Sequence, residues 1–283
     1  MSSERILVTG ATGQVGSRVV QELLKRGVKV TVYVRSPEKV PEDPNITIVQ
    51  GDFSDLTPLE NALAGHTRLF LLVFKVPETF KVKHVIAQKA YAAGVKQIVD
   101  LGSIRLPWRA FNLLESHQKA EKLIFDIPNR GSYVSLRPTN FTSNITYVAD
   151  SIKQNNTLID SAGAEELQEF ITPQDIAVVA ANIFVDPIEK HSDSAYELIG
   201  DLITPTRRAE VLAKALGRPI TYSQLPVQVL YNQFFELVKS HDVAFFITTY
   251  QRSNPVSRGL PILLGREPQT FEDWVSQNIE AFQ

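Results

Sequence analysis

The sequence of 283 residues contains no cysteine. This absence excludes disulfide bonds, thiolate metal ligands and cysteine nucleophiles, and it favours a reducing compartment. A metal site would have to be built from five scattered histidines and from carboxylates. We therefore expect an intracellular protein without a metal centre.

The sequence also lacks a large charge of one sign and a long apolar run. It has 29 basic and 31 acidic residues, for a formal net charge of −2. We expect no nucleic acid partner, because neutralising many phosphates requires a broad positive surface. The start, MSSERILVTG, lacks the features of a signal peptide, and no apolar segment is long enough to cross a bilayer. These absences predict a cytoplasmic protein with no membrane partner, and they leave its oligomeric state open.

The first half of the chain alternates short apolar runs with helical patterns. Runs that are apolar nearly throughout are typical of parallel strands covered on both faces, and the segments between them fit crossover helices. Repetition of strand and helix predicts an α/β fold with a doubly wound parallel sheet. The predicted strands are residues 5–9, 29–34, 46–50, 69–74, 97–101 and 133–137.

The rhythm of the sequence changes after Pro138, and the second half predicts a smaller α+β lobe. We expect a helical stretch over residues 164–168 and a helix opened by Pro173 and Asp175. Strands are predicted in AYELIG and ITYSQLP, and helices in residues 207–216, in YNQFFELV and in FEDWVSQNIEAF. We assign residues 1–150 to the sheet domain, to which residues 170–200 return, and residues 151–283 to the smaller lobe.

The segment ILVTGATGQVG places Gly10, Gly13 and Gly16 between the first predicted strand and the first predicted helix. In this context the glycines permit a tight turn, close approach of the backbone to a pyrophosphate, and close packing of helix on strand. The spacing therefore predicts a dinucleotide-phosphate site in a Rossmann-type domain. A tight turn without a ligand is the alternative.

Arg35 stands at the end of the second predicted strand, in VYVRSPEK. An enzyme that uses NAD carries an acidic residue at this position to bind the ribose 2′-hydroxyl, whereas a guanidinium pairs with a 2′-phosphate. Arg35 therefore favours NADP(H), and Lys39 could assist it. The alternative is that both are solvated surface charges.

Several segments together resemble the NmrA-like family of atypical short-chain dehydrogenases. The resemblance covers essentially the whole chain and depends on the set of motifs. Besides the glycine loop and Arg35, it rests on VQGDFSDLTPLENAL, GVKQIVDLGS, YVSLRPTNFTSNI, FITPQDIAVVAANIF, YELIGDLITPTRRAEVLAKALGRPITY and LLGREPQTFEDWV. It implies an NADPH-binding sheet domain, a smaller C-terminal lobe and a substrate cleft between them.

The resemblance also implies which residues bind the cofactor and the substrate. The cofactor residues would be Gly10, Thr12, Gly13, Gln14, Val15, Gly16, Arg35, Asp52, Phe53, Phe74, Lys75, Gly102, Ser103, Lys119, Pro138, Thr139 and Asn140. Phe141 and Asn144 would face the substrate. The alternative for the three phenylalanines is that they are ordinary core residues, namely Phe53, Phe74 and Phe141. Further aromatics could line an apolar cleft or pack in the core, namely Trp108, Phe111, Tyr222, Tyr231, Phe234, Phe235 and Phe245.

The segment FNLLESHQKAEKLIF contains no tyrosine, although short-chain dehydrogenases typically place their tyrosine and lysine pair on this helix. Lys119 matches in position the lysine that benzylic ether reductases of the family use as acid or base. It is therefore the first catalytic candidate, and desolvation would lower its pKa toward neutrality. His117 is the second, but two residues along a helix correspond to about 200° of rotation, so both cannot face one small site equally. Glu121 could orient one of them or be solvated.

These observations predict an NADPH-dependent oxidoreductase that reduces a small, apolar, aromatic or conjugated carbonyl, quinone-type or biosynthetic compound. Lys119 or water would supply the proton. Members of the family divide in function, so an NADP-binding redox-sensing regulator without turnover is the first alternative. An isomerase or lyase without net redox chemistry is the second.

Overall fold

The computed structural model describes residues 5–73, 78–104, 112–249 and 254–283. The chain forms two compact units, and both are discontinuous in sequence. The first combines Met1–Leu106, Leu114–Pro138 and Ile176–Glu197, and the second combines Pro107–Leu113, Thr139–Asp175 and Leu198–Gln283. One of the passages between the units follows Pro138, where the rhythm of the sequence changes.

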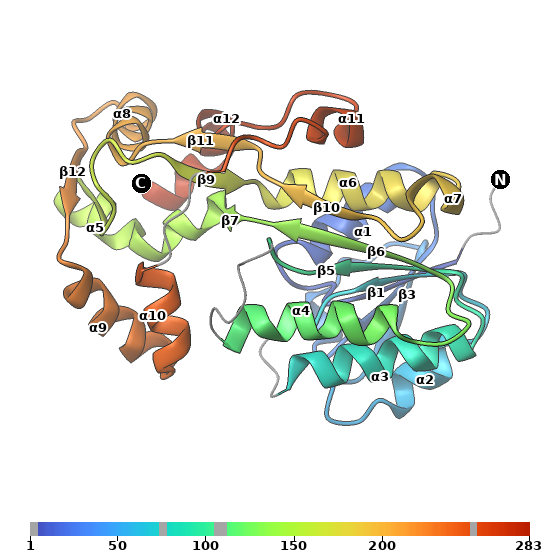
Figure 1. The fold of residues 1–283 in the computed structure, drawn as a ribbon. Coiled ribbons are helices and arrows are strands. Elements are labelled where there is room, and N and C mark those ends of the chain that lie inside the picture. The colour runs from blue at the N-terminus through green and yellow to red at the C-terminus, as the bar shows by residue number, and fades with distance from the viewer. Residues whose placement is uncertain (1–4, 74–77, 105–111, 250–253) are drawn as a thin grey trace. The chain divides into compact units, whose positions relative to one another are not determined.

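A seven-stranded sheet with the order β10-β6-β5-β4-β1-β2-β3 forms the centre of the first unit (Figure 1). The pairs β1/β2, β1/β4, β2/β3, β4/β5 and β5/β6 are all parallel. The α/β fold class predicted from the apolar runs is therefore confirmed. The strands are β1 (Ile6–Thr9), β2 (Val30–Val34), β3 (Ile46–Gln50), β4 (Arg68–Leu71), β5 (Gln97–Leu101), β6 (Ser132–Pro138) and β10 (Ala195–Leu198).

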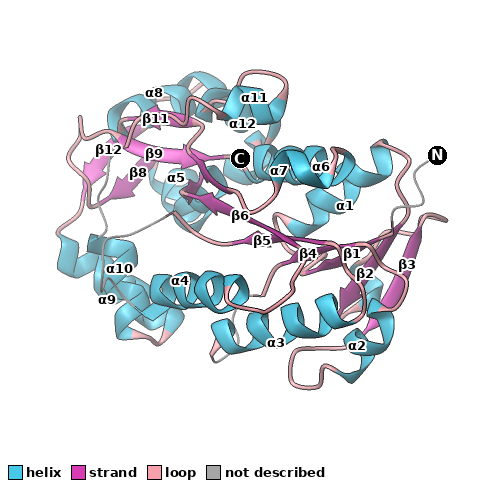
Figure 2. Ribbon diagram, turned by 45° about the vertical axis from the view of Figure 1, so that its right-hand side comes forward, coloured by secondary structure: helices cyan, strands magenta, loops and turns pink. Residues whose placement is uncertain are grey.

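Helices cover both faces of this sheet. Helices α1 (Gly16–Lys25) and α6 (Pro173–Val185) lie over one face, and α2 (Thr57–Leu63), α3 (Thr79–Ala92) and α4 (Asn112–Phe125) lie over the other (Figures 1 and 2). Val19 and Leu23, four residues apart on α1, are fully buried. On α6, the residues at positions 176, 179, 180 and 183 are buried as well. A 3₁₀ turn η1 (Pro37–Lys39) and helix α7 (Ile188–His191) complete this unit.

Strands β1 and β4 flank the point where the strand order reverses, because the chain runs from β1 outward to β3 and then returns to β4. In open α/β sheets, ligands bind beyond the carboxyl ends of the strands at such a switch point. Thr9 joins the two strand ends there: its Oγ1 donates to Leu72 O at 3.0 Å and accepts from Leu72 N at 2.8 Å. The chain turns immediately afterwards at Gly10, whose φ of +68° favours glycine.

The second unit contains a three-stranded sheet, β11-β9-β7, and a two-stranded sheet, β12-β8. A separate apolar core includes Leu158, Phe170, Leu212, Phe271 and Trp274. The strands are β7 (Asn140–Phe141), β8 (Thr157–Asp160), β9 (Gln168–Ile171), β11 (Asp201–Ile203) and β12 (Thr221–Gln224). The helices are η2 (Thr142–Val148), α5 (Ala149–Asn155), α8 (Pro205–Leu216), α9 (Val227–Val238), α10 (His241–Thr249), α11 (Leu260–Leu264), α12 (Phe271–Gln277) and η3 (Ile279–Phe282).

The predicted helical stretch over residues 164–168 is wrong. These residues form a turn that leads into β9, which pairs with β11 through Phe170 and Asp201. A five-residue segment is too short to form an independent helix. Here the Glu166 side chain accepts from Gly163 N at 2.9 Å, and Gln168 is held by polar contacts with α8 and β8. Tertiary contacts therefore determine the conformation of this segment.

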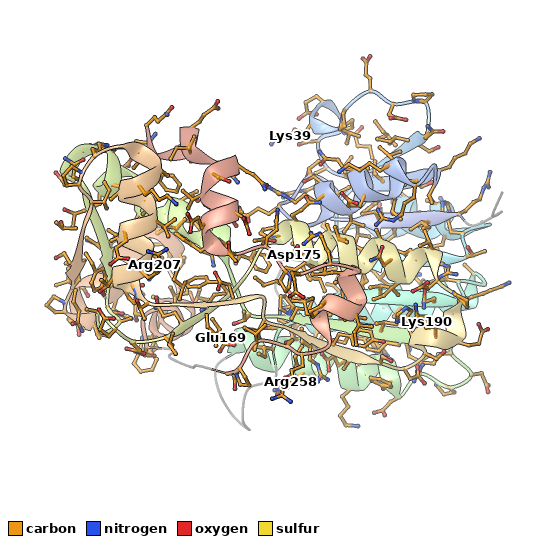
Figure 3. The ribbon with its side chains drawn as sticks, turned by 90° about the horizontal axis from the view of Figure 1, so that it is seen from above. Lys39, Glu169, Asp175, Lys190, Arg207 and Arg258 are labelled. Atoms are coloured by element: carbon orange, nitrogen blue, oxygen red, sulfur yellow. The ribbon has the colours of Figure 1, made fainter. Side chains whose placement is uncertain are left out.

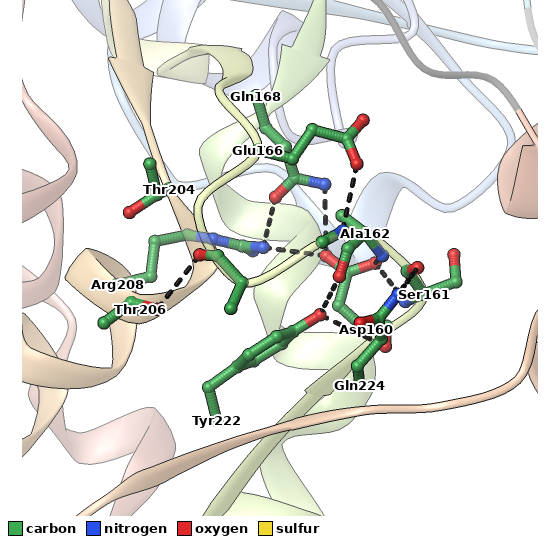
Figure 4. Close-up of polar contacts among 12 residues, drawn as sticks. Asp160, Ser161, Ala162, Glu166, Gln168, Thr204, Thr206, Arg208, Tyr222 and Gln224 are labelled. Atoms are coloured by element: carbon green, nitrogen blue, oxygen red, sulfur yellow. Dashed lines mark hydrogen bonds and ion pairs between the residues drawn. The ribbon is translucent and has the colours of Figure 1, made fainter.

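Arg208 of α8 organises these polar contacts (Figure 4). Its Nη2 donates to Asp160 Oδ2 at 2.7 Å and to the Gln168 side chain, while its guanidinium lies 5.1 Å from the centre of the Phe170 ring. The Arg208 side chain is 6% exposed and the Asp160 side chain 22% exposed. Tyr222 of β12 adds a hydrogen bond to Ala162 O at 2.5 Å. The cluster thus joins α8, β8, β9 and β12 within the second unit.

We expect Arg208→Met to lower the free energy of unfolding by about 3 kcal/mol, because it leaves the Asp160 carboxylate without its partner in a poorly solvated position. Arg207→Met is the matched control, since the Arg207 side chain is 55% exposed and forms its ion pairs with Glu210 and Glu272 at the surface (Figure 3). Urea denaturation should show a lower midpoint for Arg208→Met and an almost unchanged midpoint for Arg207→Met. Equal effects of the two changes would contradict the role assigned to the cluster.

Candidate functional site

The glycine loop joins β1 to α1 at the switch point of the sheet. Thr12, Gly13 and Gln14 are exposed at its tip, whereas Val15 and Gly16 are buried beneath it. Val15, the residue at the N-cap of α1, provides no capping side chain, and the first turn contains no acidic residue. Ser17 N is bonded to Gly13 O, but no side chain caps the start of α1 or neutralises the positive end of its dipole, and a helix start of this kind binds phosphate in other proteins.

Gly16 is required by packing inside the loop. A Cβ atom at this position would overlap Gly10 O and lie 2.7 Å from Gly10 C. At Gly13 the corresponding atom would lie 3.3 Å from Gly10 O and point into an exposed region. The absence of a side chain at Gly16 is therefore explained by the fold, whereas the absence at Gly13 leaves an open surface beside the loop.

Arg35 follows β2 directly and is exposed, as is Lys39 at the end of η1 (Figure 3). Asp52 lies beyond the end of β3. The hydroxyl and the N–H of Ser54 donate to Asp52 Oδ1 at 2.5 and 2.7 Å, and these bonds, with a smaller effect of the Arg35 charge, lower the pKa of Asp52. Asp52 and Arg35 therefore lie just beyond the ends of the adjacent strands β3 and β2.

Phe53 packs partly into the core of the first unit, with its ring 5.9 Å from that of Tyr33. The core interpretation of this aromatic is thus supported by a specific contact. The Tyr33 hydroxyl donates to Asp52 O at 2.6 Å, and desolvation, together with the charges of Asp52 and Asp55, raises the pKa of Tyr33 to about 12. Tyr33 therefore serves as a neutral hydrogen-bond donor that supports the loop after β3.

Backbone hydrogen bonds join the loop that follows β5 to the end of β6. Gly102 N donates to Leu136 O at 2.8 Å, and Ile104 N donates to Pro138 O at 3.1 Å. Gly102 and Pro138 are buried, and Ser103 is half-buried. Three of the predicted cofactor residues therefore lie at the carboxyl end of the sheet, Gly102 and Ser103 in the loop after β5 and Pro138 at the end of β6.

Glu121 of α4 is buried against β6 rather than solvated. Its carboxylate accepts from Arg137 Nε at 3.0 Å, from Arg137 Nη2 at 2.5 Å and from Ser135 Oγ at 2.6 Å. This paired carboxylate fixes the rotation of α4 against the sheet. Glu121 is thus an anchor for the helix that carries both catalytic candidates.

Lys119 and His117 face different neighbours, as the helical spacing predicts. Lys119 is exposed, and its Nζ lies 5.5 Å from the centre of the Phe80 ring on α3. His117 is half-buried, and its Nδ1 lies 3.4 Å from Lys83 Nζ. Desolvation, with a smaller contribution from the Lys83 charge, lowers the pKa of His117 to about 3. His117 is therefore the more enclosed of the two side chains.

Lys83 and Asp100 form a buried ion pair that sequence reasoning missed. Both side chains are 0% exposed, and Lys83 Nζ lies 2.7 Å from Asp100 Oδ1. The Tyr133 hydroxyl donates to Asp100 Oδ2 at 2.9 Å. Lys83 stands among the apolar residues of α3, and Asp100 stands among those of β5. A charged residue inside an apolar pattern is the signal that could have identified this pair.

The remaining predicted residues fall into two groups. Thr139, Asn140, Phe141 and Asn144 belong to the second unit, where Thr139 N donates to Leu198 O at 3.2 Å and β7 pairs with β9. Phe74, Lys75, Trp108 and Phe111 lie outside the described residues. Of the aromatics in the second unit, Phe235 and Phe245 are 36% and 40% exposed, so neither is a core residue.

In the described part of the chain, no three histidine, aspartate or glutamate side chains are grouped closely enough to hold a metal ion. No helix there combines the length and apolar character that crossing a membrane requires.

The sequence model of the NmrA-like family matches residues 2–274. This chain belongs to the NmrA-like family. A related member, the (4-alkanoyl-5-oxo-2,5-dihydrofuran-3-yl)methyl phosphate reductase of Streptomyces griseus, is 27% identical over 98% of this chain and 99% of its own length. The resemblance predicted from the motifs is therefore confirmed over nearly the whole sequence.

Two solved structures extend the comparison for this NmrA-like chain. An NADPH-dependent quinone oxidoreductase from Escherichia coli, solved with NADPH, is 26% identical, with a TM-score of 0.79 over 97% of this chain and 99% of that one. NmrA itself, a negative transcriptional regulator solved with NADP, has a TM-score of 0.79 over 98% of this chain and 96% of its own, at 16% identity. The second likeness shows the fold alone.

The packing of Gly16 generates a prediction that is independent of any ligand. We expect Gly16→Ala to destabilise the protein and lower its melting temperature by several degrees, because the methyl group would overlap the Gly10 carbonyl. Gly13→Ala should have a much smaller effect, since its methyl group requires a shift of only a few tenths of an ångström. Thermal denaturation followed by circular dichroism checks both, and a Gly16→Ala protein as stable as the parent would show that the close contact is absent.

Proposed function

We propose that this NmrA-like protein is an NADPH-dependent reductase of a small apolar compound with a conjugated carbonyl or quinone-type group. The observation that carries the proposal is the uncapped start of α1 at the switch point of the sheet, followed by Arg35 at the end of β2. The reductase names of full-length relatives support the reaction type.

The loop residues fit a dinucleotide. The exposed residues Thr12, Gly13 and Gln14 would hold the pyrophosphate, and Arg35 would bind the 2′-phosphate. Gly102, Ser103 and Pro138 would support the ribose and nicotinamide from the loops after β5 and β6. When bound, NADPH supplies a hydride that an electrophilic carbon accepts.

The protein must also supply or position a proton, because hydride addition to a carbonyl leaves a negative oxygen. We assign proton delivery to Lys119 or to a water molecule beside it. Lys119 is exposed and lies over the Phe80 ring, so a water molecule can reach it from solvent. Most of the rate enhancement would then come from holding cofactor and substrate in the reactive orientation.

A second candidate function is an NADP-binding regulator without turnover. The absence of a tyrosine from the segment between residues 111 and 125 favours it, since the usual proton donor of short-chain dehydrogenases is missing there. Consumption of NADPH in the presence of a panel of quinones, aldehydes and enones separates the two functions. A protein that binds NADPH tightly and oxidises it with none of these compounds would be a regulator.

Cofactor choice is tested by Arg35→Asp. We expect NADPH to bind at least about tenfold more weakly, because hydrogen bonds to a charged group contribute about 1.5–3 kcal/mol and the exposed site is screened by water. NADH binding should change little. Calorimetric titration measures both affinities, and an equal loss for both cofactors would refute the assigned contact.

Proton delivery is tested by Lys119→Met, measured at saturating NADPH. If the ammonium delivers the proton, turnover should fall by about 10² to 10⁴, the usual range for general acid catalysis. His117→Gln is the matched control on the same helix and should retain most of the turnover. An active Lys119→Met enzyme with unchanged kcat would assign the proton to water, and loss confined to His117→Gln would assign it to the histidine.

A further inference from the structure

A buried polar cluster lies behind His117 and joins three elements of the first unit. Lys83 on α3 and Asp100 on β5 are 0% exposed, as is Tyr133 on β6. Asp100 accepts from Lys83 at one carboxylate oxygen, at 2.7 Å, and from the Tyr133 hydroxyl at the other, at 2.9 Å. With Lys83 Nζ at one oxygen and the Tyr133 hydroxyl at the other, Asp100 forms an ion pair with Lys83. Its buried negative charge requires a cation, and Lys83 is the cation in contact with it.

The hydrogen bonds of Lys83 determine what His117 can be. An ammonium has three protons and no acceptor site. Lys83 Nζ donates to Asp100 Oδ1 and to Leu101 O, both at 2.7 Å, and its third neighbour is His117 Nδ1 at 3.4 Å. The His117 Nδ1 that faces the ammonium must therefore be the acceptor, because a proton on that nitrogen would point at a cation.

We propose that Lys83 holds His117 as a neutral imidazole with its proton on Nε2. His117 then offers a hydrogen-bond donor to the substrate oxygen and does not serve as the acid. The contact with the substrate rests on the reductase function proposed above, whereas the charge and the tautomer of His117 depend only on the buried cluster.

The surroundings of His117 are consistent with a neutral ring. Protonation would place a second cation 3.4 Å from Lys83 Nζ, and desolvation together with the Lys83 charge lowers the pKa of His117. The Asp100 carboxylate is bonded to Lys83 and to Tyr133. On α4 itself, Glu121 is paired with Arg137 and Lys119 lies over Phe80. Lys83 is therefore the charged group that the structure places in contact with the ring.

A neutral imidazole has a defined role in hydride addition to a carbonyl. As the hydride adds to carbon, the carbonyl π bond breaks and its electron pair moves to oxygen. An Nε2–H group that donates to this oxygen stabilises the developing charge without losing its proton. The proton that completes the alcohol then comes from Lys119 or water, so the two candidates on α4 would have different functions.

The charge and tautomer can be measured directly, without turnover. In full-length protein with ¹⁵N-labelled histidine, two-bond ¹H–¹⁵N spectra between pH 5 and 8 report the protonation of each ring nitrogen, and His117→Gln identifies the signals of His117. We expect the Nε2–H form across this range, with no titration. A His117 ring that titrates within it, or that carries its proton on Nδ1, would overturn the proposal whether or not the protein is a reductase.

The role of Lys83 needs a variant that keeps the buried site neutral. Lys83→Met alone leaves Asp100 buried without a counter-charge and is expected to unfold the protein. The double variant Lys83→Met with Asp100→Asn removes both charges. The amide oxygen introduced by Asp100→Asn can still accept the hydrogen bond from the Tyr133 hydroxyl. We expect the pKa of His117 to rise by at least about one unit in this protein, since a cation at 3.4 Å is removed. An unchanged pKa in the folded double variant would show that Lys83 does not control the ring, and the spectra of the parent protein still test the proposal if the variant does not fold.

Turnover distinguishes a hydrogen-bond donor from a structural residue. His117→Ala should lower kcat by about ten- to a hundredfold with little change in the NADPH affinity, and His117→Gln should recover most of it, because its amide also donates. Equal losses in both variants, accompanied by lower melting temperatures, would assign His117 a structural role only.

Discussion

The close approach of helix α1 to the end of strand β1 is the constraint on which the site in the first unit depends. The helix begins directly against the Gly10 carbonyl, in a space that no side chain at Gly16 could share. Thr9 simultaneously ties β1 to the end of β4. The exposed part of the loop is thereby held at the switch point of the sheet, where the N–H groups of α1 face the region in which α/β proteins bind phosphates.

Buried ion pairs attach the helices on the other face to the sheet. Lys83 and Asp100 join α3 to β5, and Glu121 joins α4 to β6 through Arg137. Removing one partner from such a pair leaves an uncompensated charge in a poorly solvated place, so each pair restrains the helix that carries it. The rotation of α4, and hence the separate neighbours of its histidine and lysine, follows from these contacts.

Sequence patterns predicted the sheet domain well because its strands are apolar nearly throughout and its helices carry one buried stripe. Val19 and Leu23 are buried as their spacing predicts, and β3 and β5 have the predicted bounds. The helix predicted over residues 164–168 does not form, because Gln168 is held in β9 by Arg208, forty residues further along the chain. No local pattern contains that information.

The amino-acid sequence by itself determined the fold class, the glycine loop and the family, since all three depend on residue types at fixed spacing along the chain. Helical spacing also predicted that Lys119 and His117 cannot face one small site equally. Only the tertiary structure decided which of them is enclosed, because that depends on Lys83, a residue 34 positions away that reaches His117 through the packing of α3 against α4. A buried charge affects its neighbours through space, and its effect on the imidazole is therefore visible only after the two helices have been placed on the sheet.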